Sequence, residues 1–495
     1  MNTHLSQLRY ALSFLLTLLA TTVASAQALT ISVSNRADYP RKDAPVVIEL
    51  HQYLPAGTHV TSAIVTDAKG REYASQLDDL DGDRIPDELV FTANLPVRST
   101  TDFVATLSTT DPQRPYPART DAFIKLWDRK YRYPRINQIE FTGNNDPLAT
   151  YDAIYGHGAM WESEYVGFRV YMDHRQSIDI YGKPKPSLVL DKTNFYATRE
   201  DIQNGLGCDI LFAGQSVGVG SFRGYLDGQP TYIDSVEARG QRVIVSGPVR
   251  SIVEVWDRNW FYRGRNVQMR QRYTMYAGHR DVHFECWLTG IDDADTFCTG
   301  VQKLEQDNEG FIEPNGLAGS WGRNVPDKAN PDLVESVGLG IRVPRPFLRE
   351  VKEDSLNYLC LLRPRQGYIA YDFVICALME ERGFKSGREW LDWLKQWNEE
   401  KRTWIDTDVR YLASTESTGM HYAPATLIIL CEEDALSNII NTARQYGYIV
   451  LHTYDTIHGC AIRIPPTKSI EESISFFQRL KGVLQVSRDQ ILQPQ

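Results

Sequence analysis

Short runs in which apolar and polar residues alternate fill most of the chain. Between Leu29 and Thr110 at least five such runs, among them LTISVSN and DFVATLS, are separated by turn residues. Because alternation with a period of two places apolar side chains on one face of a strand, residues 29–110 are predicted to form a small β-sandwich. The Pro-rich stretch DPQRPYP then begins a predicted linker over residues 111–135.

The same alternation dominates residues 136–412, in runs such as RVIVSGPVRSIVEVWD and NVQMRQRYTMYA. Because strand follows strand without helical patterns between them, we expect a large antiparallel β-sandwich here. One helix is predicted near its end, in SGREWLDWLKQWNEEKRTW. There Ser386 and Glu389 fit a capping box, and apolar side chains recur on one helical face.

The C-terminal segment has a different pattern. Residues 423–495 read as β, α, β, β, α and β, with Gly447 and Gly482 where helix C-caps are needed. This order is typical of an α+β, ferredoxin-like module. The segment lacks a catalytic constellation, so it is predicted to dock a protein or another domain. The whole chain is therefore predicted to be mainly β, with three folded units.

The first residues are predicted to be a targeting signal. Arg9 precedes the apolar run ALSFLLTLLATTVA, and the small residues SAQA follow it. This is the pattern of a Sec signal peptide, here residues 1–28, and no cysteine stands nearby to carry a lipid anchor. The apolar run is short for a membrane span, and the sequence shows no second candidate. We therefore expect a periplasmic or secreted protein without a transmembrane segment.

Composition narrows the partners. The net charge is -10 and the sequence has no long basic tract, which argues against nucleic acid and anionic membranes as partners. The seven cysteines form no CxxC pair, and most lie in apolar strand-like runs. Buried free thiols are the favoured interpretation, and a disulfide is the alternative.

An acidic loop, DDLDGDRIPDE, interrupts the predicted N-terminal sandwich. Four carboxylates stand at the spacing of oxygen ligands for Ca²⁺: Asp79, Asp81, Asp83 and Asp87. The match to an EF-hand loop is imperfect, because Val90 stands where a bidentate Glu is expected. The other interpretation is a hairpin, since Asp81-Gly82 is a strong turn signal. If calcium binds here, we expect its role to be structural.

A polar strip is predicted in the strand that begins at Glu162. Alternation puts Arg169, Tyr171 and Asp173 on one face, a composition suited to stacking a sugar ring and bonding its hydroxyls or a carboxylate. Glu162 and Glu164 are expected at the open end of that strand, with α-carbons about 6.6 Å apart. Two carboxylates so close could form a glycosidase pair.

The alternative interpretation of those glutamates is structural. One would pair with Arg169 or Arg175 and the other would be solvated. His157 lies in YGHGAM, which is predicted to be a Gly-flanked loop just before the strand. Since loops on rigid sheets often carry function, His157 is the first candidate for acid–base chemistry, with turn capping as its alternative.

A second polar group lies in YAGHRDVHFEC. His279 with Asp281 is a plausible pair of acid–base and orienting residues, and Arg280 lies between them. His279 and His283 have the HxxxH spacing, but four residues of strand span about 13 Å, so a zinc site is rejected. In GCDILFAGQSVGVGSFRG the glycines are read as turn and packing residues rather than a nucleotide loop, while Gln215 is a candidate for sugar binding.

Three stretches together resemble a known family. WESEYVGFRVYMDHRQSIDIYGK, GCDILFAGQSVGVGSFRG and QRYTMYAGHRDV look like, in this order, a Bacteroidota family defined by domain of unknown function 4861. The resemblance covers residues 29–412. The family is met among genes for polysaccharide breakdown and is similar to galactose-mutarotase-like β-supersandwiches. The resemblance therefore implies that fold for residues 136–412 and a carbohydrate context, but no mechanism.

Together these patterns predict an exported protein that acts on oligosaccharides or polysaccharides, including uronate-bearing ones. In a β-elimination, a carboxylate would be neutralised by Arg169, Arg175 and Arg280. His157 or His279 would then move the proton, assisted by Tyr171. In a hydrolysis, the carboxylates would act instead: Glu162, Glu164 and Asp173.

The sequence does not decide between these reactions. A non-catalytic glycan-binding protein is the alternative, because the same strip would serve. A structural or assembly role through the C-terminal module is a third hypothesis.

Overall fold

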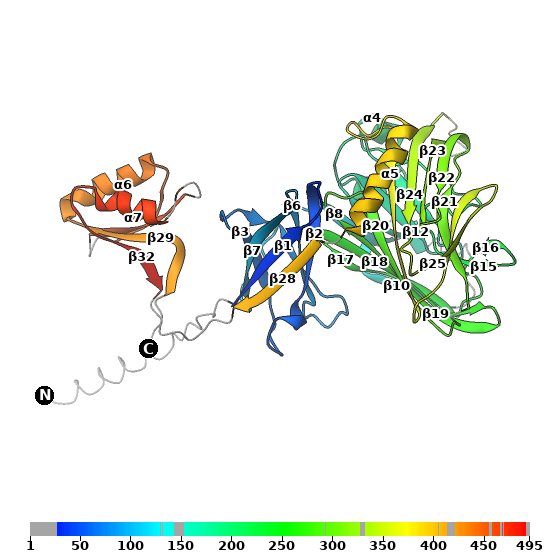
Figure 1. Ribbon diagram of the computed structural model, residues 1–495, viewed down its shortest axis with the longest axis horizontal. Helices are drawn as coiled ribbons and strands as arrows, with labels where there is room; N and C mark the ends of the chain where they lie inside the picture. Colours follow the sequence, from blue (N-terminus) through cyan, green and yellow to red (C-terminus); the bar gives the residue numbers. More distant parts are fainter. Residues whose placement is uncertain are drawn as a thin grey trace.

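The computed structural model is mainly β, with 52% of residues in strands and 12% in helices, as predicted. Figure 1 shows the arrangement of its elements. The structure describes residues 27–128, 130, 132–142, 153–292, 294–326, 332–403, 405–412, 421–454, 458–465, 468 and 470–491. The predicted signal peptide lies almost entirely outside the described residues. No helix within the described ranges is long and apolar enough to span a membrane.

The N-terminal unit is a two-layer sandwich. Its first sheet has the strand order β28-β1-β7-β3-β4: β1 (Gln27–Asn35), β3 (Ser62–Asp67), β4 (Glu72–Tyr73), β7 (Ser99–Ser108) and β28 (Ile405–Leu412). Its second has the order β2-β6-β5: β2 (Arg41–Glu49), β5 (Ser75–Asp78) and β6 (Glu88–Leu95). A short 3-10 helix, η1 (Leu50–Gln52), follows β2. Alternate residues such as Leu29, Ile31 and Val33 fill the core between the sheets.

Strand β28 corrects the predicted domain boundary. Residues 405–412 were expected in the large sandwich, but they pair antiparallel with β1, from Ala28 opposite Leu412 to Asn35 opposite Ile405. Figure 1 shows this orange strand lying among the blue strands. The N-terminal sandwich is therefore built from both ends of the 27–412 region. Residues 120–126, expected in a linker, are strand β8 of the large unit.

The large unit packs one wide sheet against two smaller ones. The nine-stranded sheet has the order β10-β17-β18-β19-β20-β27-β24-β23-β22. Its strands are β10 (Gln138–Thr142), β17 (Ala238–Ser246), β18 (Arg250–Tyr262), β19 (Arg265–Tyr276), β20 (Asp281–Thr289), β22 (Gln306–Ile312), β23 (Leu317–Asn324), β24 (Glu335–Arg342) and β27 (Tyr368–Ala377). The main hydrophobic core lies between this sheet and the two smaller sheets.

A six-stranded sheet, β14-β13-β12-β11-β8-β9, forms part of the opposite layer. Its strands are β8 (Thr120–Leu126), β9 (Arg135–Ile136), β11 (Ile154–Ser163), β12 (Val166–Tyr171), β13 (Ile178–Gly182) and β14 (Cys208–Asp209). A five-stranded sheet completes the layer: β15 (Arg223–Leu226), β16 (Gln229–Thr231), β21 (Phe297–Gln302), β25 (Leu348–Glu353) and β26 (Asn357–Leu362). Two short helices, α3 (Leu190–Thr193) and α4 (Arg199–Gln203), lie between β13 and β14.

The predicted helix is α5 (Gly387–Arg402), which packs on the wide sheet. The hydroxyl of Ser386 accepts the backbone N–H of Glu389, as a helix N-cap does. The Glu389 carboxylate instead accepts the N–H of Lys385, so the capping box is only half formed. Trp390, Leu394 and Trp397 are buried against the sheet.

Buried polar contacts dock the N-terminal sandwich onto the large unit. The Arg250 guanidinium is 5% exposed and forms ion pairs with Asp78 and, at 2.6 Å, Glu88. The side chain of Gln76 accepts the N–H groups of Val249 and Arg250 at 3.0 and 3.1 Å. Because a buried ion pair needs good geometry to offset desolvation, these contacts fix the two units in one arrangement.

The C-terminal unit is the predicted ferredoxin-like module. Its antiparallel sheet has the order β30-β31-β29-β32, and the helices pack on it. The elements are β29 (His421–Cys431), η2 (Glu433–Ala435), α6 (Leu436–Gln445), β30 (Ile449–Tyr454), β31 (Gly459–Arg463), α7 (Ile470–Gln478) and β32 (Val483–Ile491). Among the described residues these four strands pair only with one another.

Candidate active site

A cavity of about 630 Å³ opens on the outer face of the six-stranded sheet, beside the segment that contains α3 and α4. Its volume lies in the usual range for small-ligand pockets, about 300–1,000 Å³. Strands β11, β12 and β14 contribute one wall, and residues 195–202 contribute the other. We call this cavity the strand pocket. The side chains that matter chemically are His157, Arg169, Tyr171, Phe195, Tyr196 and Asp209.

Arg169 is the centre of the strand pocket. Its side chain is 2% exposed and forms an ion pair with Asp179. It also donates to the hydroxyls of Tyr171 and Tyr196, at 3.0 and 3.2 Å, and to the carbonyl of Gly156 at 3.2 Å. Its Nε is buried and finds no acceptor among the described residues. Burial opposes its charge, but the Asp179 carboxylate keeps the pKa of Arg169 well above its usual value.

Aromatic rings line the pocket around this guanidinium. The ring of Tyr171 stacks on the imidazole of His157, with centroids 6.2 Å apart and planes inclined by 15°. The guanidinium of Arg169 lies 4.5 Å from the centroid of Phe195. Tyr196 meets His157 edge-on at 6.0 Å and is 46% exposed. Flat, amphipathic walls of this kind suit a ligand that has both apolar faces and hydroxyl groups.

Asp209 is the acidic group of the pocket. Register pairs it with Tyr181 on β13, two residues from Asp179, so both carboxylates lie on the outer face of the sheet. Burial, and then the charge of Asp179, raise the pKa of Asp209 well above its usual range. Arg169, 3.9 Å away, offsets this only in part. Asp209 therefore holds its proton at a pH where an ordinary aspartate is ionised, while its side chain stays 29% exposed.

Two residues of the strand pocket have a strained backbone. His157 has φ of 64° and Phe195 has φ of 67°, in the left-handed region that non-glycine residues rarely adopt. At His157 the cause is a register shift in β11 between Tyr155 and Met160, which turns the side chain out of the regular alternation. Gly158 is required next to it, because a Cβ there would lie 1.9 Å from the carbonyl oxygen of Val170. Such strain clusters at functional sites.

His157 was predicted in a loop, but it lies within strand β11. The predicted single strand from Glu162 is in fact a hairpin, in which β11 ends at Ser163 and β12 begins at Val166. Arg169 and Tyr171 do share the outer face, as predicted, opposite the buried Val166. Glu162 is on that same outer face, since it lies opposite Gly167, and not on the face first expected.

Glu162 is buried and structural. Its carboxylate forms an ion pair with Lys183, and both side chains are 0% exposed. It also accepts the N–H groups of Val189 and Leu190 at 2.9 and 2.8 Å, at the start of α3. Lys183 donates further to the carbonyls of Ser163 and Ser187. This pair therefore ties the segment that carries Phe195 and Tyr196 to the sheet.

Glu164, the other predicted glutamate, also has structural partners. Arg119 forms an ion pair with it, and the N–H of Gly278 donates to it at 3.0 Å. The glycosidase pair suggested by the sequence is therefore not formed. Among the predicted binding residues, Asp173 is 1% exposed and pairs with Arg175, whose guanidinium lies 4.8 Å from the Tyr171 ring centroid.

The remaining predicted residues lie elsewhere. Gln215 accepts a hydrogen bond from Tyr232 at 3.0 Å and does not line the strand pocket. His279, Arg280 and Asp281 border a different cavity, where the large unit meets the N-terminal sandwich. The structure therefore does not bring His279 and Arg280 together with His157 in one site.

His279 and Asp281 do form the predicted pair, with Nδ1 and Oδ1 3.0 Å apart. However, Nε2 of His279 lies 2.8 Å from the carbonyl of Asp43, so both ring nitrogens are engaged. Burial opposes charge on the ring, but Asp281 raises the pKa of His279. Lys401 also pairs with Asp281. His279 thus bonds Asp281 in the large unit and Asp43 in the N-terminal sandwich. A charged imidazole in this position holds the two units together and is not suited to act as a catalytic base.

The acidic loop brings three of its four predicted ligands together. Carboxylate oxygens of Asp79, Asp81 and Asp87 lie within 4.8 Å of one another, and Asp83 is not in this group. Asp83 instead accepts the N–H of Ile85 at 2.7 Å, as part of the turn. Three hard carboxylate oxygens suit Ca²⁺, which takes six to eight oxygen ligands. Asp79, Asp81 and Asp87 thus suit the predicted ion. The hairpin expected as the alternative also forms, since β5 pairs with β6, but its loop spans residues 79–87 instead of the two residues Asp81-Gly82.

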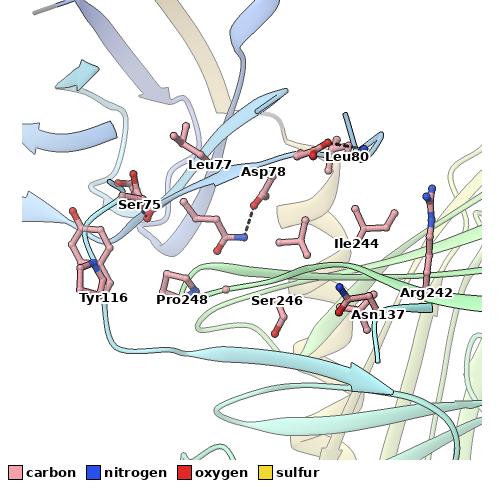
Figure 2. Close-up of a pocket in the computed structure, with 18 of the residues that line it drawn as sticks. Ser75, Leu77, Asp78, Leu80, Tyr116, Asn137, Arg242, Ile244, Ser246 and Pro248 are labelled. Carbon is pink, nitrogen blue, oxygen red and sulfur yellow. Dashed lines mark hydrogen bonds between the residues drawn. The ribbon is translucent and has the colours of Figure 1, made fainter. Parts of the chain in front are cut away.

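A second cavity, of about 620 Å³, lies beside this loop between the N-terminal sandwich and β17. Figure 2 shows Asp78 and Leu80 on one side of it and Ile244 and Arg242 on the other. Within the sandwich the amide of Gln76 donates to Asp78 at 2.7 Å, and both side chains bind Arg250 of the large unit. Of the polar side chains in this cavity, Gln76 and Asp78 therefore join the two units, whereas Arg242 pairs with Glu254 and Ser246 donates to Asp121 within the large unit.

Comparison with known proteins places the chain in a protein family. The family described as "Domain of unknown function (DUF4861)" matches residues 33–405. The chain belongs to this family. The match covers both the N-terminal sandwich and the large unit, so the strand pocket lies inside the DUF4861 region. No curated protein matches the chain.

Solved structures similar to this DUF4861 protein include two from Enterococcus faecalis. One is described as a protein in glycosyl hydrolase family 38, with a TM-score of 0.40 and 10% identity over 81% of this chain and 50% of that chain. The other is described as an alpha-mannosidase, with a TM-score of 0.39 and 11% identity over 81% and 49%. The chain thus spans about half the length of these structures. At such scores no activity is transferred from them.

Sequence reasoning missed three residues that line the strand pocket, Phe195, Tyr196 and Asp209, and also Asp179, the ion-pair partner of Arg169. A signal for Asp209 was present, because it is a carboxylate at the start of the apolar run CDILFAG. Asp179 could be found from the pairing of β12 with β13, which places it opposite Arg169. Phe195 and Tyr196 lie outside any strand, so alternation gives no signal for them.

Proposed function

We propose that this DUF4861 protein is an exported enzyme that hydrolyses glycosidic bonds in oligosaccharides, with Asp209 as the proton donor. The observation that carries the proposal is a carboxyl group in a 630 Å³ pocket walled by aromatic rings, where burial and Asp179 raise its pKa. A general acid needs a pKa near the working pH, and Asp209 has a raised one. The predicted signal peptide supports export.

The pocket offers groups for each part of that reaction. Tyr196, which is 46% exposed, and Tyr171 line the pocket and would contact a sugar ring. Asp209 would protonate the oxygen that leaves when the bond between the two sugars breaks. His157 lines the same pocket and would take a proton from the attacking water, whose oxygen then bonds to the anomeric carbon. Arg169 holds both tyrosine hydroxyls in place.

Charge pairing favours hydrolysis over β-elimination. Elimination at a uronic acid needs a cation that neutralises the substrate carboxylate. Both arginines that line the strand pocket already have carboxylate partners, Arg169 with Asp179 and Arg199 with Asp332 at 2.8 Å. A neutral sugar unit at the reacting position therefore fits this pocket better than an uronate does.

The test is incubation with a panel of neutral and acidic oligosaccharides, read by mass spectrometry. Hydrolysis adds one water to the products for each bond cleaved, whereas elimination gives unsaturated products that absorb in the ultraviolet. Asp209→Asn and His157→Asn should each lower turnover by about 100-fold or more. Two matched controls, the exposed Asp227→Asn and His59→Asn, should retain it.

Three outcomes contradict the proposal. Unsaturated products would replace hydrolysis with elimination. Binding without any product would leave the glycan-binding alternative. Full activity in Asp209→Asn would remove Asp209 as the acid.

A further inference from the structure

The outer face of the nine-stranded sheet carries an ordered set of polar and aromatic side chains. Cross-strand register puts Trp256, Arg270, Trp287 and Tyr368 in one row across β18, β19, β20 and β27. Arg270 lies 4.3 Å from the Trp287 ring centroid, and the rings of Trp287 and Tyr368 are 5.6 Å apart. All four side chains are partly exposed. The adjoining row holds Arg242, Glu254, Arg272 and Glu285.

Three guanidinium groups in these rows surround one carboxylate. Glu254 is 2% exposed and lies 2.7 Å from Arg242, 3.2 Å from Arg272 and 3.7 Å from Arg270. One negative charge therefore meets three positive charges. Arg272 also has a buried Nε that finds no acceptor in the described part of the chain. This cluster has more positive charge than its internal partner neutralises, so it suits a further carboxylate, which arginine binds in bidentate geometry.

A cavity of about 450 Å³ adjoins the three arginines, and its opposite wall is acidic. That wall comes from the N-terminal sandwich and includes Glu49, Asp81 and Asp87. Glu88 also lines it, but Glu88 is already paired with Arg250. A ligand between these walls must present an anion to the guanidinium side and hydrogen-bond donors to the carboxylate side. A uronic acid has both, since its carboxylate and its hydroxyls lie on different edges of the ring.

We propose that this cavity and the adjacent aromatic row form a second saccharide site that binds a uronate unit. The carboxylate would bind Arg242, Arg270 and Arg272, the hydroxyls would donate to the acidic wall, and Trp287 with Tyr368 would border the neighbouring sugar. The choice of a saccharide rests on the proposed function. The second site shares no residue with the strand pocket. It would hold an acidic unit of a polysaccharide, and the strand pocket would cleave a linkage at a neutral unit of the same polysaccharide.

The experiment is titration of the full-length protein with oligogalacturonate and alginate oligomers, followed by tryptophan fluorescence and calorimetry. Carboxyl-reduced, neutral versions of the same oligomers serve as the matched ligands. The acidic oligomers should bind, and the reduced ones should bind at least about tenfold more weakly. Affinity should fall as salt rises, because the contact is ionic.

Variants of opposite sign sharpen the test. Arg242→Gln/Arg270→Gln should weaken binding by about tenfold or more, whereas Glu254→Gln should strengthen it, because it removes the competing anion. Arg258 is an exposed arginine on β18, the strand of Glu254, and does not line the cavity, so Arg258→Gln should leave the affinity for acidic oligomers unchanged. Melting curves show which variants remain folded.

The outcomes separate this site from the strand pocket. Asp209→Asn should bind the acidic oligomers with wild-type affinity even though its turnover falls. If neither acidic oligomer binds, if the reduced ligands bind equally well, or if the arginine variants bind normally, the second site is overturned. None of these results depends on whether the strand pocket is catalytic.

Discussion

Removal of the buried cation at Lys183 is the sharpest test of how the strand pocket is held together. In Lys183→Met the Glu162 carboxylate stays buried and keeps two N–H donors, at Val189 and Leu190, but it loses its counter-charge. Breaking a buried ion pair by removing one partner costs about 3–5 kcal/mol of unfolding free energy. Since 1 kcal/mol shifts the melting temperature of a domain of this size by about 2–4 °C, the large unit should melt roughly 6–20 °C lower.

A double variant separates the charge effect from the loss of packing. In Lys183→Met/Glu162→Gln no uncompensated charge remains, so a large part of the lost stability should return. Lys185→Met is the matched control, because Lys185 is 67% exposed and its pair with Glu381 lies at the surface. That variant should cost no more than about 1 kcal/mol.

Scanning calorimetry measures each variant, and the transition of the large unit is read separately from that of the other units. Limited proteolysis of residues 183–207 adds a local measurement. This segment begins at Lys183 and carries Phe195 and Tyr196, so it should be cut faster in Lys183→Met than in the wild type. A melting shift as small as that of Lys185→Met, or a double variant as unstable as the single one, would refute the role given to this pair.

Three further predictions follow from the same contacts. Burial and Asp179 raise the pKa of Asp209, and its proton-donating form is lost as pH rises through that pKa. Turnover should therefore fall on the alkaline side of the pH profile. Asp209→Asn should lower kcat by about 100-fold or more and remove this alkaline fall. If the alkaline fall persists in this variant, the fall belongs to another titrating group. Calcium should raise the melting temperature of the N-terminal sandwich, and Asp81→Asn should abolish that rise in calorimetry; identical melting in calcium and in chelator would exclude the ion. Burial opposes ionisation of Asp372, but Lys401 and His283 lower its pKa to about 2. The ionised carboxylate therefore stabilises the folded state fully at pH values well above about 3.9, the pKa of Asp in the unfolded chain, and this stabilisation is lost as pH falls toward 2. Asp372→Asn should therefore reduce the melting temperature at pH 7 much more than at pH 2, and an equal loss at both would contradict this.

The strands and helices were predictable because their signals are local. Alternation over a few residues gave the β-rich units, and the change of period after residue 423 gave the ferredoxin-like module. Helix α5 was found from Ser386 and its apolar stripe. The face shared by Arg169 and Tyr171 was also predicted, because two residues on one strand lie on one side.

What failed depends on pairing between distant segments. The sequence of residues 405–412 contains no signal for their pairing with β1, because an alternating pattern predicts a strand but not its partner. Glu162 looked catalytic because its cation, Lys183, lies 21 positions away and across a turn. His157 looked like a loop residue because glycines flank it, but here the glycines permit a bulge inside a strand. A carboxylate pattern therefore shows where chemistry is possible and not which charge neutralises it.

The pairing of β28 with β1 has a consequence for how the chain is made and how it can be rearranged. Strand β1 is synthesised first, yet one of its edges stays open until residue 412 has been added, so the N-terminal sandwich cannot be completed vectorially. Once it has folded, Ala28 lies opposite Leu412, and the two ends of the 27–412 body are neighbours. A short peptide could join them and new ends could be opened in a surface turn, which makes this body a natural candidate for circular permutation.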